Sequence, residues 1–321
     1  MRSQIIAPVL GAGLMLVAGA VQAQTVGMAT SPAGSLYHTQ GSAIAPMLKE
    51  KGNIELRIQP FTSPEIHLPA INAGQIEFGL ANIYDLYLAV AGLEFFRGKK
   101  NENLRLVTIT APLRSAIFVK KDSPVKQLAD LKGQRITWGY VQQNTIKQQL
   151  LSYFDAAGLD EKDIVPVLVP AVVRGADDFA AGKADAFLFA VGSAKVTEVD
   201  ASVGGVRALP LPDGPQAQAA FKKHFPPAYI QVVNPGPGLA GILAPTPIMT
   251  YDAVMVTHAA APEELIYNMT KTLHENAAAV DKSSPTLRGF TAGGMAKKIE
   301  LAEYHPGAIK YYKEKGLWPP K

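Results

Sequence analysis

The chain of 321 residues contains no cysteine. This absence excludes a disulfide framework, a thiolate metal site, a cysteine nucleophile and a lipid-modified N-terminal cysteine. Histidine is also scarce, and the six histidines lack the spacing of metal ligands; His274-Glu275, for example, has no second histidine to complete a helical zinc site. We therefore expect no bound metal.

An excess of charge of one sign is missing as well. Lysine and arginine number 31 against 27 aspartates and glutamates, which gives a formal net charge of +4. The basic residues form only short runs, such as Lys99-Lys100 and Lys120-Lys121. Nucleic-acid-binding proteins concentrate positive charge on one face and interleave aromatic residues with it. The dispersed lysines predict a solvated surface and no nucleic-acid partner.

Recognisable catalytic and cofactor motifs are lacking. Gly236 to Gly241 matches the GxGxxG dinucleotide pattern, but Pro237 lies inside it and Pro245 and Pro247 follow. No helix can therefore begin where a pyrophosphate needs one. No serine lies in a GxSxG elbow. The sequence predicts a protein that is not an enzyme and that has no cofactor.

Long hydrophobic runs are confined to the N-terminus. Arg2 provides a positive charge, Ile5 to Ala20 is uncharged, and Val21-Gln22-Ala23 is a small-x-small cleavage site. A membrane anchor is the alternative, but the run is marginal in length and is interrupted by Pro8. No later segment approaches the ~18–20 apolar residues that cross a bilayer. We expect residues 1–23 to be a signal peptide and the rest to be soluble in the periplasm of a Gram-negative bacterium.

What the chain does contain is a repeated sequence pattern, called the echo below. The pattern of Ala73 to Leu80 recurs at Ala181 to Leu188: in each segment a helical run ends at a glycine and a short apolar strand follows. A second echo has the order strand, polar loop, helix. Its first copy covers residues 25–29, 30–34 and 35–49, and its second covers residues 135–139, 140–144 and 145–157.

Each half of the chain thus has the order of an α/β lobe with a mainly parallel sheet. Two such lobes predict a cleft between them, because open α/β sheets hold ligands at the carboxyl ends of their strands. The alternative is that these common junctions recur by chance.

The chain is expected to cross between the lobes twice. Leu104 to Thr110 and Arg114 to Val119 are extended runs that Ala111-Pro112-Leu113 interrupts, and Ala253 to Val256 is a strand that can return. Between Leu209 and Pro247 we expect little regular structure apart from a short strand. The predicted domains are lobe I (residues 24–112 and 251–321) and lobe II (residues 113–250), joined by a hinge.

Polar loops precede a helix in each lobe. Ser31 to Ser35 leads into the first helix, and Gln142 to Thr145 leads into its counterpart. Free N–H groups and the positive end of a helix dipole favour an anion. Ser35 and Thr145 could instead be ordinary N-caps, but their equivalent positions in both lobes favour ligand binding.

Other candidates lie near the ends of the echo strands and at the first crossing. An aromatic residue there is often part of the core, whereas Arg114 in a crossing strand could offer a bidentate fork to a carboxylate. The expected ligand-binding residues are Gly34, Ser35, Tyr37, Ser63, Asn82, Arg114, Gln142, Gln143, Asn144, Thr145 and Phe189.

Two segments carry a resemblance to a known family. Pro32 to Tyr37 is similar to the glycine-rich segment, ending in tyrosine, of the TAXI-type solute-binding proteins of TRAP transporters, and His305 to Gly316 resembles the closing signature of that family. The resemblance implies a two-lobed periplasmic-binding-protein fold of type II-like organisation. It also implies a receptor for small organic anions that serves a TRAP-type membrane permease.

The chain departs from the family in one loop. Where the family has Pro-Gly-Ser-Gly-Thr, this chain has Val141 to Thr145, which retains the threonine but replaces both glycines by Gln142 and Asn144. These larger side chains reshape the wall of the site. The ligand therefore need not be glutamate or 2-oxoglutarate.

The sequence thus predicts a monomeric receptor that captures a small mono- or dicarboxylate and delivers it to a TRAP permease. A ligand-sensing subunit for a membrane sensor kinase is the first alternative, and an exported enzyme that uses the cleft is the second. A neighbouring gene for a permease or for a kinase would separate the first two readings.

The signal-peptide prediction is testable by mass. Protein from a periplasmic extract is expected to lack residues 1–23 and to begin at Gln24, because Val21-Gln22-Ala23 fits a signal-peptidase site. Intact mass spectrometry measures this directly. An uncleaved, membrane-bound product would contradict the prediction.

Overall fold

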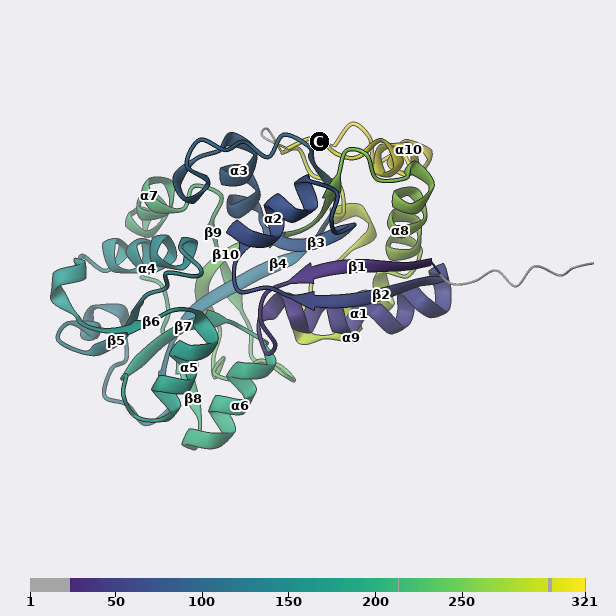
Figure 1. Ribbon diagram of the computed structural model, residues 1–321. Helices are drawn as coiled ribbons and strands as arrows, with labels where there is room; N and C mark the ends of the chain where they lie inside the picture. The colour runs from purple at the N-terminus through teal and green to yellow at the C-terminus, as the bar shows by residue number, and fades with distance from the viewer. Residues whose placement is uncertain (1–23, 213, 300–301, 321) are drawn as a thin grey trace, which may run out of the picture.

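The computed structural model describes residues 24–212, 214–299 and 302–320, and the expected signal peptide lies outside this part of the chain. The strands form one sheet in the order β2-β1-β3-β10-β4-β7-β5-β6, with β8 beside β4 and β9 beside β10 (Figure 1). The strands are β1 (Gln24–Thr30), β2 (Ile54–Pro60), β3 (Phe78–Asn82), β4 (Leu104–Lys120), β5 (Arg135–Gly139), β6 (Val165–Val169), β7 (Ala186–Ala190), β8 (Val206–Ala208), β9 (Tyr229–Val233) and β10 (Thr246–His258).

The sheet has a parallel group of strands at each end. β1 pairs in parallel with β2 and β3, and β5 pairs in parallel with β6 and β7. The central strands β4 and β10 are antiparallel to each other and to the parallel groups that they join. Each group is one lobe of the molecule, so the echo in the sequence corresponds to two similar α/β units.

The two long strands cross between these units. The first half of β4 pairs with β10, and its second half, from Ser115 to Val119, pairs with β7. β10 first pairs with β9 and then, from Ala253 to Val256, with β3. The expected domain boundaries fall inside these two strands, and they remain a prediction.

The expected interruption at Pro112 was wrong, because β4 runs unbroken through it. Pro112 has no N–H group to donate, and the register shifts beside it, where Ala253 pairs with Ala111 but Val254 pairs with Ile109. Thr110 is thus the extra residue of a bulge that lies two residues before Pro112, while Pro112 itself stays in register with Asp252.

Helices cover both faces of the sheet (Figure 1). α1 packs against β2 and α8, while α2 and α3 pack against β3 and β10 on the other side. The helices are α1 (Leu36–Gly52), α2 (Pro64–Asn72), α3 (Ile83–Ala91), α4 (Thr145–Ala156), α5 (Val172–Ala180), α6 (Ala194–Val203), α7 (Pro215–His224), α8 (Glu263–Glu275), α9 (Ala277–Ser283) and α10 (Pro306–Glu314). α7 lies in the segment for which little regular structure was expected; Pro215 begins it at a position where proline needs no N–H partner.

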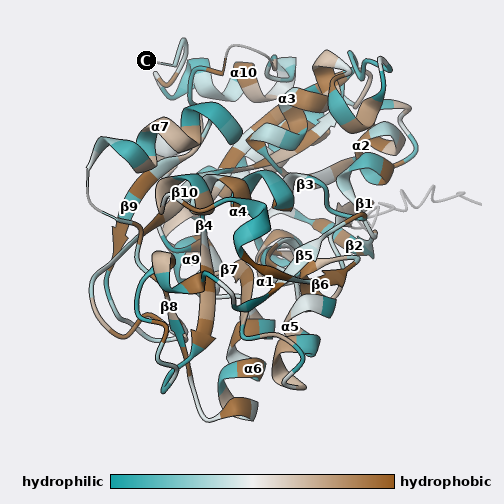
Figure 2. Ribbon diagram, turned by 90° about the vertical axis from the view of Figure 1, so that its left-hand side faces the viewer, coloured by the Kyte–Doolittle hydropathy of each residue, from teal (hydrophilic) through white to brown (hydrophobic). Residues whose placement is uncertain are grey.

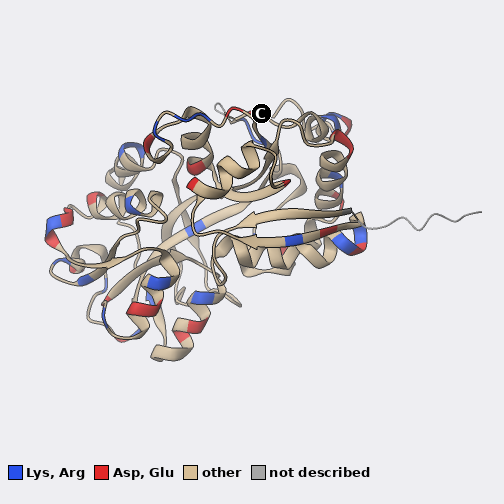
Figure 3. Cartoon of the chain, viewed as in Figure 1, with Lys and Arg blue, Asp and Glu red and all other residues tan. Residues whose placement is uncertain are grey.

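Hydrophobic residues follow the central strands, and hydrophilic residues lie on outer loops and helix faces (Figure 2). In the view of Figure 3, basic and acidic residues are intermixed around the outer helices. Among the helices of the described residues, none has the length and apolar character that crossing a membrane requires.

Gly307 lies at a close contact between α10 and α8, and it belongs to the closing segment noted in the sequence. A Cβ atom there would lie 2.3 Å from the backbone oxygen of Glu263, which cannot move aside as a side chain can. We expect Gly307→Ala to lower the free energy of unfolding by about 1–3 kcal/mol, the usual cost of overpacking. Urea denaturation followed by circular dichroism measures this change.

Gly293 provides the matched control, because a Cβ atom built there meets no heavy atom within 4 Å among the described residues. Gly293→Ala should change stability by less than about 0.5 kcal/mol. Equal stability of the two variants would show that the α8–α10 contact yields without cost.

Candidate functional site

A cavity of about 70 Å³ lies between the two units of the fold. Its wall is formed by the loop before α1, the junction of β3 and α3, the start of α4, the end of β7 and the middle of β4 and β10. The volume is well below the ~300–1,000 Å³ of sites for drug-sized ligands. In this conformation the cavity therefore admits only a small molecule.

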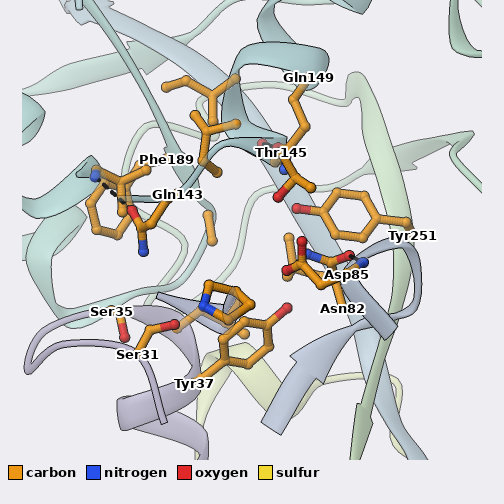
Figure 4. A pocket seen from close by; sticks show the side chains of 18 residues that line it. Ser31, Ser35, Tyr37, Asn82, Asp85, Gln143, Thr145, Gln149, Phe189 and Tyr251 are labelled. Carbon is orange, nitrogen blue, oxygen red and sulfur yellow. Dashed lines mark hydrogen bonds between the residues drawn. The ribbon is translucent and has the colours of Figure 1, made fainter. Parts of the chain in front are cut away.

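Six of the residues predicted from the sequence line this cavity, and they come from four separate segments of the chain (Figure 4). They are Ser35, Tyr37, Asn82, Gln143, Thr145 and Phe189. The two polar loops therefore meet as the echo suggested.

The N-termini of α1 and α4 both reach the cavity. Ser35 is the N-cap of α1, and its hydroxyl accepts a long 3.4 Å hydrogen bond from the N–H of His38. Thr145 is the first residue of α4, while the preceding Asn144 makes no side-chain capping bond. Ser35 thus combines a cap with a place in the wall, whereas Thr145 lines the wall without capping the helix.

Two glutamine side chains present donors to the cavity. Gln143 Oε1 accepts from the N–H of Val172 at 2.9 Å, and Gln149 Oε1 accepts from Ser115 Oγ at 2.8 Å. With both oxygens engaged, the NH₂ groups remain to donate. Gln149 Nε2 is fully buried and finds no partner among the described residues, and the same is true of the Tyr37 hydroxyl. A buried donor without a partner is costly, so these groups are available to hydrogen-bond a ligand.

Asp85 is a buried carboxyl group in the wall of the cavity. It is 3% exposed, its N–H donates to Asn82 Oδ1 at 2.7 Å, and its Oδ2 accepts from Asn82 Nδ2. Burial and the nearby charge of Glu65 raise the pKa of the Asp85 carboxyl to about 8, against the opposing effect of hydrogen bonds from Thr145 and Asn82. At neutral pH the carboxyl group is therefore mostly uncharged.

Tyr37 and Tyr251 complete the polar wall beside Asp85 (Figure 4). Burial is the main cause that raises the pKa of both phenols well above the ordinary value, and the charge of Asp85 contributes. Both therefore stay neutral, and each can donate or accept one hydrogen bond.

The structure places five predicted residues outside the lining of the cavity. Gln142 is exposed, and Ser63 and Asn144 line an adjacent open groove, where Asn144 Nδ2 donates to Glu65 Oε1 at 3.3 Å. The side chain of Glu65 on α2 thus contacts the loop before α4. Gly34, with φ of +83°, shapes the loop before α1 without reaching the cavity.

Arg114 is the fifth of these residues, and its guanidinium is engaged elsewhere. Its Nε donates to Gln231 Oε1 at 3.1 Å, and its Nη2 donates to the backbone oxygen of Arg288 at 2.9 Å. Arg114 thus links β4 to β9 and to the segment after α9. The flanking residues Leu113 and Ser115 line the cavity, because successive side chains of a strand point to opposite faces.

Sequence reasoning missed Asp85, Gln149, Ser115 and Tyr251. For two of them a signal was present: Asp85 follows the cap residue Asn82 by three positions, and Gln149 lies one helical turn after Thr145, on the same face of α4. The lining includes no lysine, arginine or histidine. Within the described ranges, no His, Asp and Glu side chains cluster as a metal site requires.

Comparison with known proteins agrees with this architecture. The model of the NMT1-like family matches residues 28–316. The chain is similar in structure to the periplasmic binding protein BugD (11% identity, TM-score 0.56, covering 92% of this chain and 95% of that one). It is also similar to a protein described as a periplasmic transporter (14% identity, TM-score 0.55, covering 92% of this chain and 93% of that one). The alkanesulfonate-binding protein SsuA from Xanthomonas axonopodis pv. citri, bound to MOPS, is a further match (16% identity, TM-score 0.50, covering 94% of this chain and 96% of that one). These similarities confirm the predicted two-lobed periplasmic-binding-protein fold.

The raised pKa of Asp85 makes a prediction for stability. The unfolded-state pKa of aspartate is about 3.9 and the folded-state value is about 8, so the folded protein holds more protons between these limits. The contribution of the Asp85 carboxyl group to the free energy of unfolding is therefore fully present below about pH 4. It is lost progressively up to about pH 8, at no more than about 1.4 kcal/mol per pH unit.

Asp85→Asn removes this titration, so its stability relative to the wild type should rise steadily from about pH 5 to about pH 8. Urea denaturation across this range measures the difference. The exposed Asp122 is the control, and Asp122→Asn should differ from the wild type by a constant amount. A constant difference for Asp85→Asn as well would show that the Asp85 carboxyl titrates normally.

Proposed function

The chain belongs to the NMT1-like family, and we propose that it is an extracytoplasmic solute-binding receptor that captures a small mono- or dicarboxylate between α1 and α4 and delivers it to a TRAP-type permease. The single observation that carries the ligand class is the small cavity at two helix N-termini, where glutamine and tyrosine side chains offer hydrogen-bond donors within a mainly apolar lining. Capture requires binding and hinge closure, and it breaks no bond in the ligand.

The donors in the wall favour an acceptor-rich ligand. The oxygens of Gln143 and Gln149 are engaged while their NH₂ groups face the cavity, and the hydroxyl of Tyr37 adds a donor that can turn toward a ligand. Hydrogen bonds to a charged group contribute about 1.5–3 kcal/mol each. Several such bonds can replace the water that a carboxylate loses on entering the cavity.

The absence of a cation from the lining does not exclude an anion. Helix N-termini carry roughly half a positive charge and free N–H groups, and together they favour negative groups. The dipoles of α1 and α4 thus give the wall a positive electrostatic potential, although no lysine, arginine or histidine side chain contributes to it. A small ligand whose oxygens reach both N-termini would hold the two lobes together in the closed form.

The transport role rests on the fold and on the TAXI resemblance of the two segments described above. We propose the periplasm as the compartment and a monomer as the functional form. We also propose that the hinge lies where β4 and β10 cross between residues 24–112 and 251–321 on one side and 113–250 on the other. A sensor-kinase subunit remains the alternative output of the same binding event.

A thermal-shift panel tests the ligand class. We expect the stabilising compounds to be small mono- and dicarboxylates, because a ligand that binds only the folded form stabilises it by about 2.7 kcal/mol at a hundredfold excess over Kd. Hydroxyl or keto oxygens should improve binding, because the wall offers more donors than one carboxylate can use. Taurine, simple alkanesulfonates, neutral sugars and amines complete the panel. Shifts from sugars or amines and none from carboxylates would contradict the proposal, and a preference for alkanesulfonates would replace the carboxylate by another anion.

Two adjacent glutamines localise any such binding. Gln143 lines the cavity and Gln142 does not, although the two share their chemistry and lie in the same loop. For the best carboxylate of the panel, Gln143→Ala should weaken binding at least about tenfold, as expected for a lost hydrogen bond to a charged group. Gln142→Ala should leave it within about twofold of the wild type. Calorimetric titration separates the two results, and equal effects would place the ligand elsewhere.

A further inference from the structure

The cavity holds a carboxyl group with no positive partner. Asp85 lies in its wall, 3% exposed, and Figure 4 shows its side chain beside Tyr37, Thr145 and Tyr251, facing the space that they enclose. Asn82, the N-cap residue of the same helix α3, donates a hydrogen bond to Oδ2 of Asp85. Thr145 at the start of α4 also hydrogen-bonds to the carboxyl group, which faces the cavity.

The charged and titratable groups around Asp85 come from four helices and strands, and all of them are acids. They are Glu65 on α2, Tyr84 on α3, Tyr37 on α1 and Tyr251 on β10. The segment at the start of α4 contributes the neutral Thr145. No lysine, arginine or histidine lines the cavity, so an ionised Asp85 would have hydrogen bonds from Asn82 and Thr145 but no positive partner.

An anionic ligand would add a second negative charge within this space. Two carboxyl groups that share a desolvated site cannot both ionise readily, and one of them retains its proton. The neutral carboxyl group then donates an O–H···O⁻ hydrogen bond, which is among the strongest that proteins form.

We infer that Asp85 determines specificity as a neutral acid: it keeps its proton and donates it to a ligand oxygen, so that the receptor captures a carboxylate together with one proton. This inference rests on the proposed function. It distinguishes an anion, which needs Asp85 neutral, from an ammonium group, which would bind an ionised Asp85 as its counter-ion.

The inference determines the sign of a pH effect. Asp85 has a pKa of about 8 in the ligand-free protein, so the fraction with a neutral carboxyl falls about tenfold between pH 7 and pH 9. The affinity for a carboxylate should fall by the same factor. At about pH 9 the ligand-free protein must take up a proton as it binds, whereas well below the pKa it need not.

Calorimetric titration of the mature protein with acetate, succinate, glutarate and 2-oxoglutarate tests this inference. Titrations at about pH 7 and about pH 9, in buffers of different ionisation enthalpy, report both the affinity and the number of protons exchanged. We expect a carboxylate that binds to do so about tenfold more weakly at the higher pH, with uptake of nearly one proton. This readout uses the wild-type chain and does not depend on how any variant folds.

Two variants then assign the proton. Asp85→Asn keeps a neutral donor that cannot ionise, so its carboxylate affinity should be the same at both pH values, while Asp122→Asn should retain the wild-type dependence. Carboxylate binding that is independent of pH, or that strengthens with proton release at high pH, would overturn the inference and leave the proposed function standing. If none of the four carboxylates bound at either pH, both would fail, and tighter binding of amines at high pH would identify Asp85 as an ionised acceptor.

Discussion

The antiparallel pairing of β4 with β10 is the interaction on which the rest of the structure depends. β4 and β10 pair with each other, β10 also pairs with β3 and β4 also pairs with β7, so together they join the two parallel groups and determine how the lobes face each other. They also bring Ser115 and Tyr251 into the wall of the cavity. Arg114 reinforces the crossing, because its guanidinium joins β4 to Gln231 on β9 and to the Arg288 carbonyl.

The position of the strand pair explains which polar groups reach the otherwise mainly apolar wall of the cavity. β3 and β7 flank the pair, and the chain that leaves β3 begins α3 with Asn82 as its N-cap, which holds Asp85 in the wall. From the other lobe, α4 presents Thr145 and Gln149 from one face. Neutral donors and helix ends can accommodate an anion at lower desolvation cost than a buried arginine would incur.

Much of the architecture could be predicted from the sequence because its signals are local. Glycine at a helix end and an apolar strand directly after it are properties of a few consecutive residues, and they recur in both lobes at Gly74 and Gly182. The same holds for the loops that begin α1 and α4. By contrast, a strand break was expected at Pro112 because proline disfavours a strand locally, whereas pairing with Asp252 on a distant strand keeps β4 continuous.

The candidate site was harder to predict, and Arg114 shows the reason. Its type suited an anion, but the alternation of side chains along β4 turns Leu113 and Ser115 to the cavity and Arg114 away from it. Which face of a strand is the inner one depends on partners distant in the chain, and no local pattern contains that information. Gln142 and Gln143 are likewise adjacent residues of the same type, yet only Gln143 lines the cavity and Gln142 is exposed.

The sequence by itself determined the α/β class, the two similar units and the pair of polar loops at helix N-termini, because each is encoded by contiguous residues. Tertiary structure alone decided that Asp85, Tyr37 and Tyr251 would share one desolvated space. The ionisation of a carboxyl group depends on which charges and how much water surround it, and the fold assembles those surroundings from segments far apart in the chain.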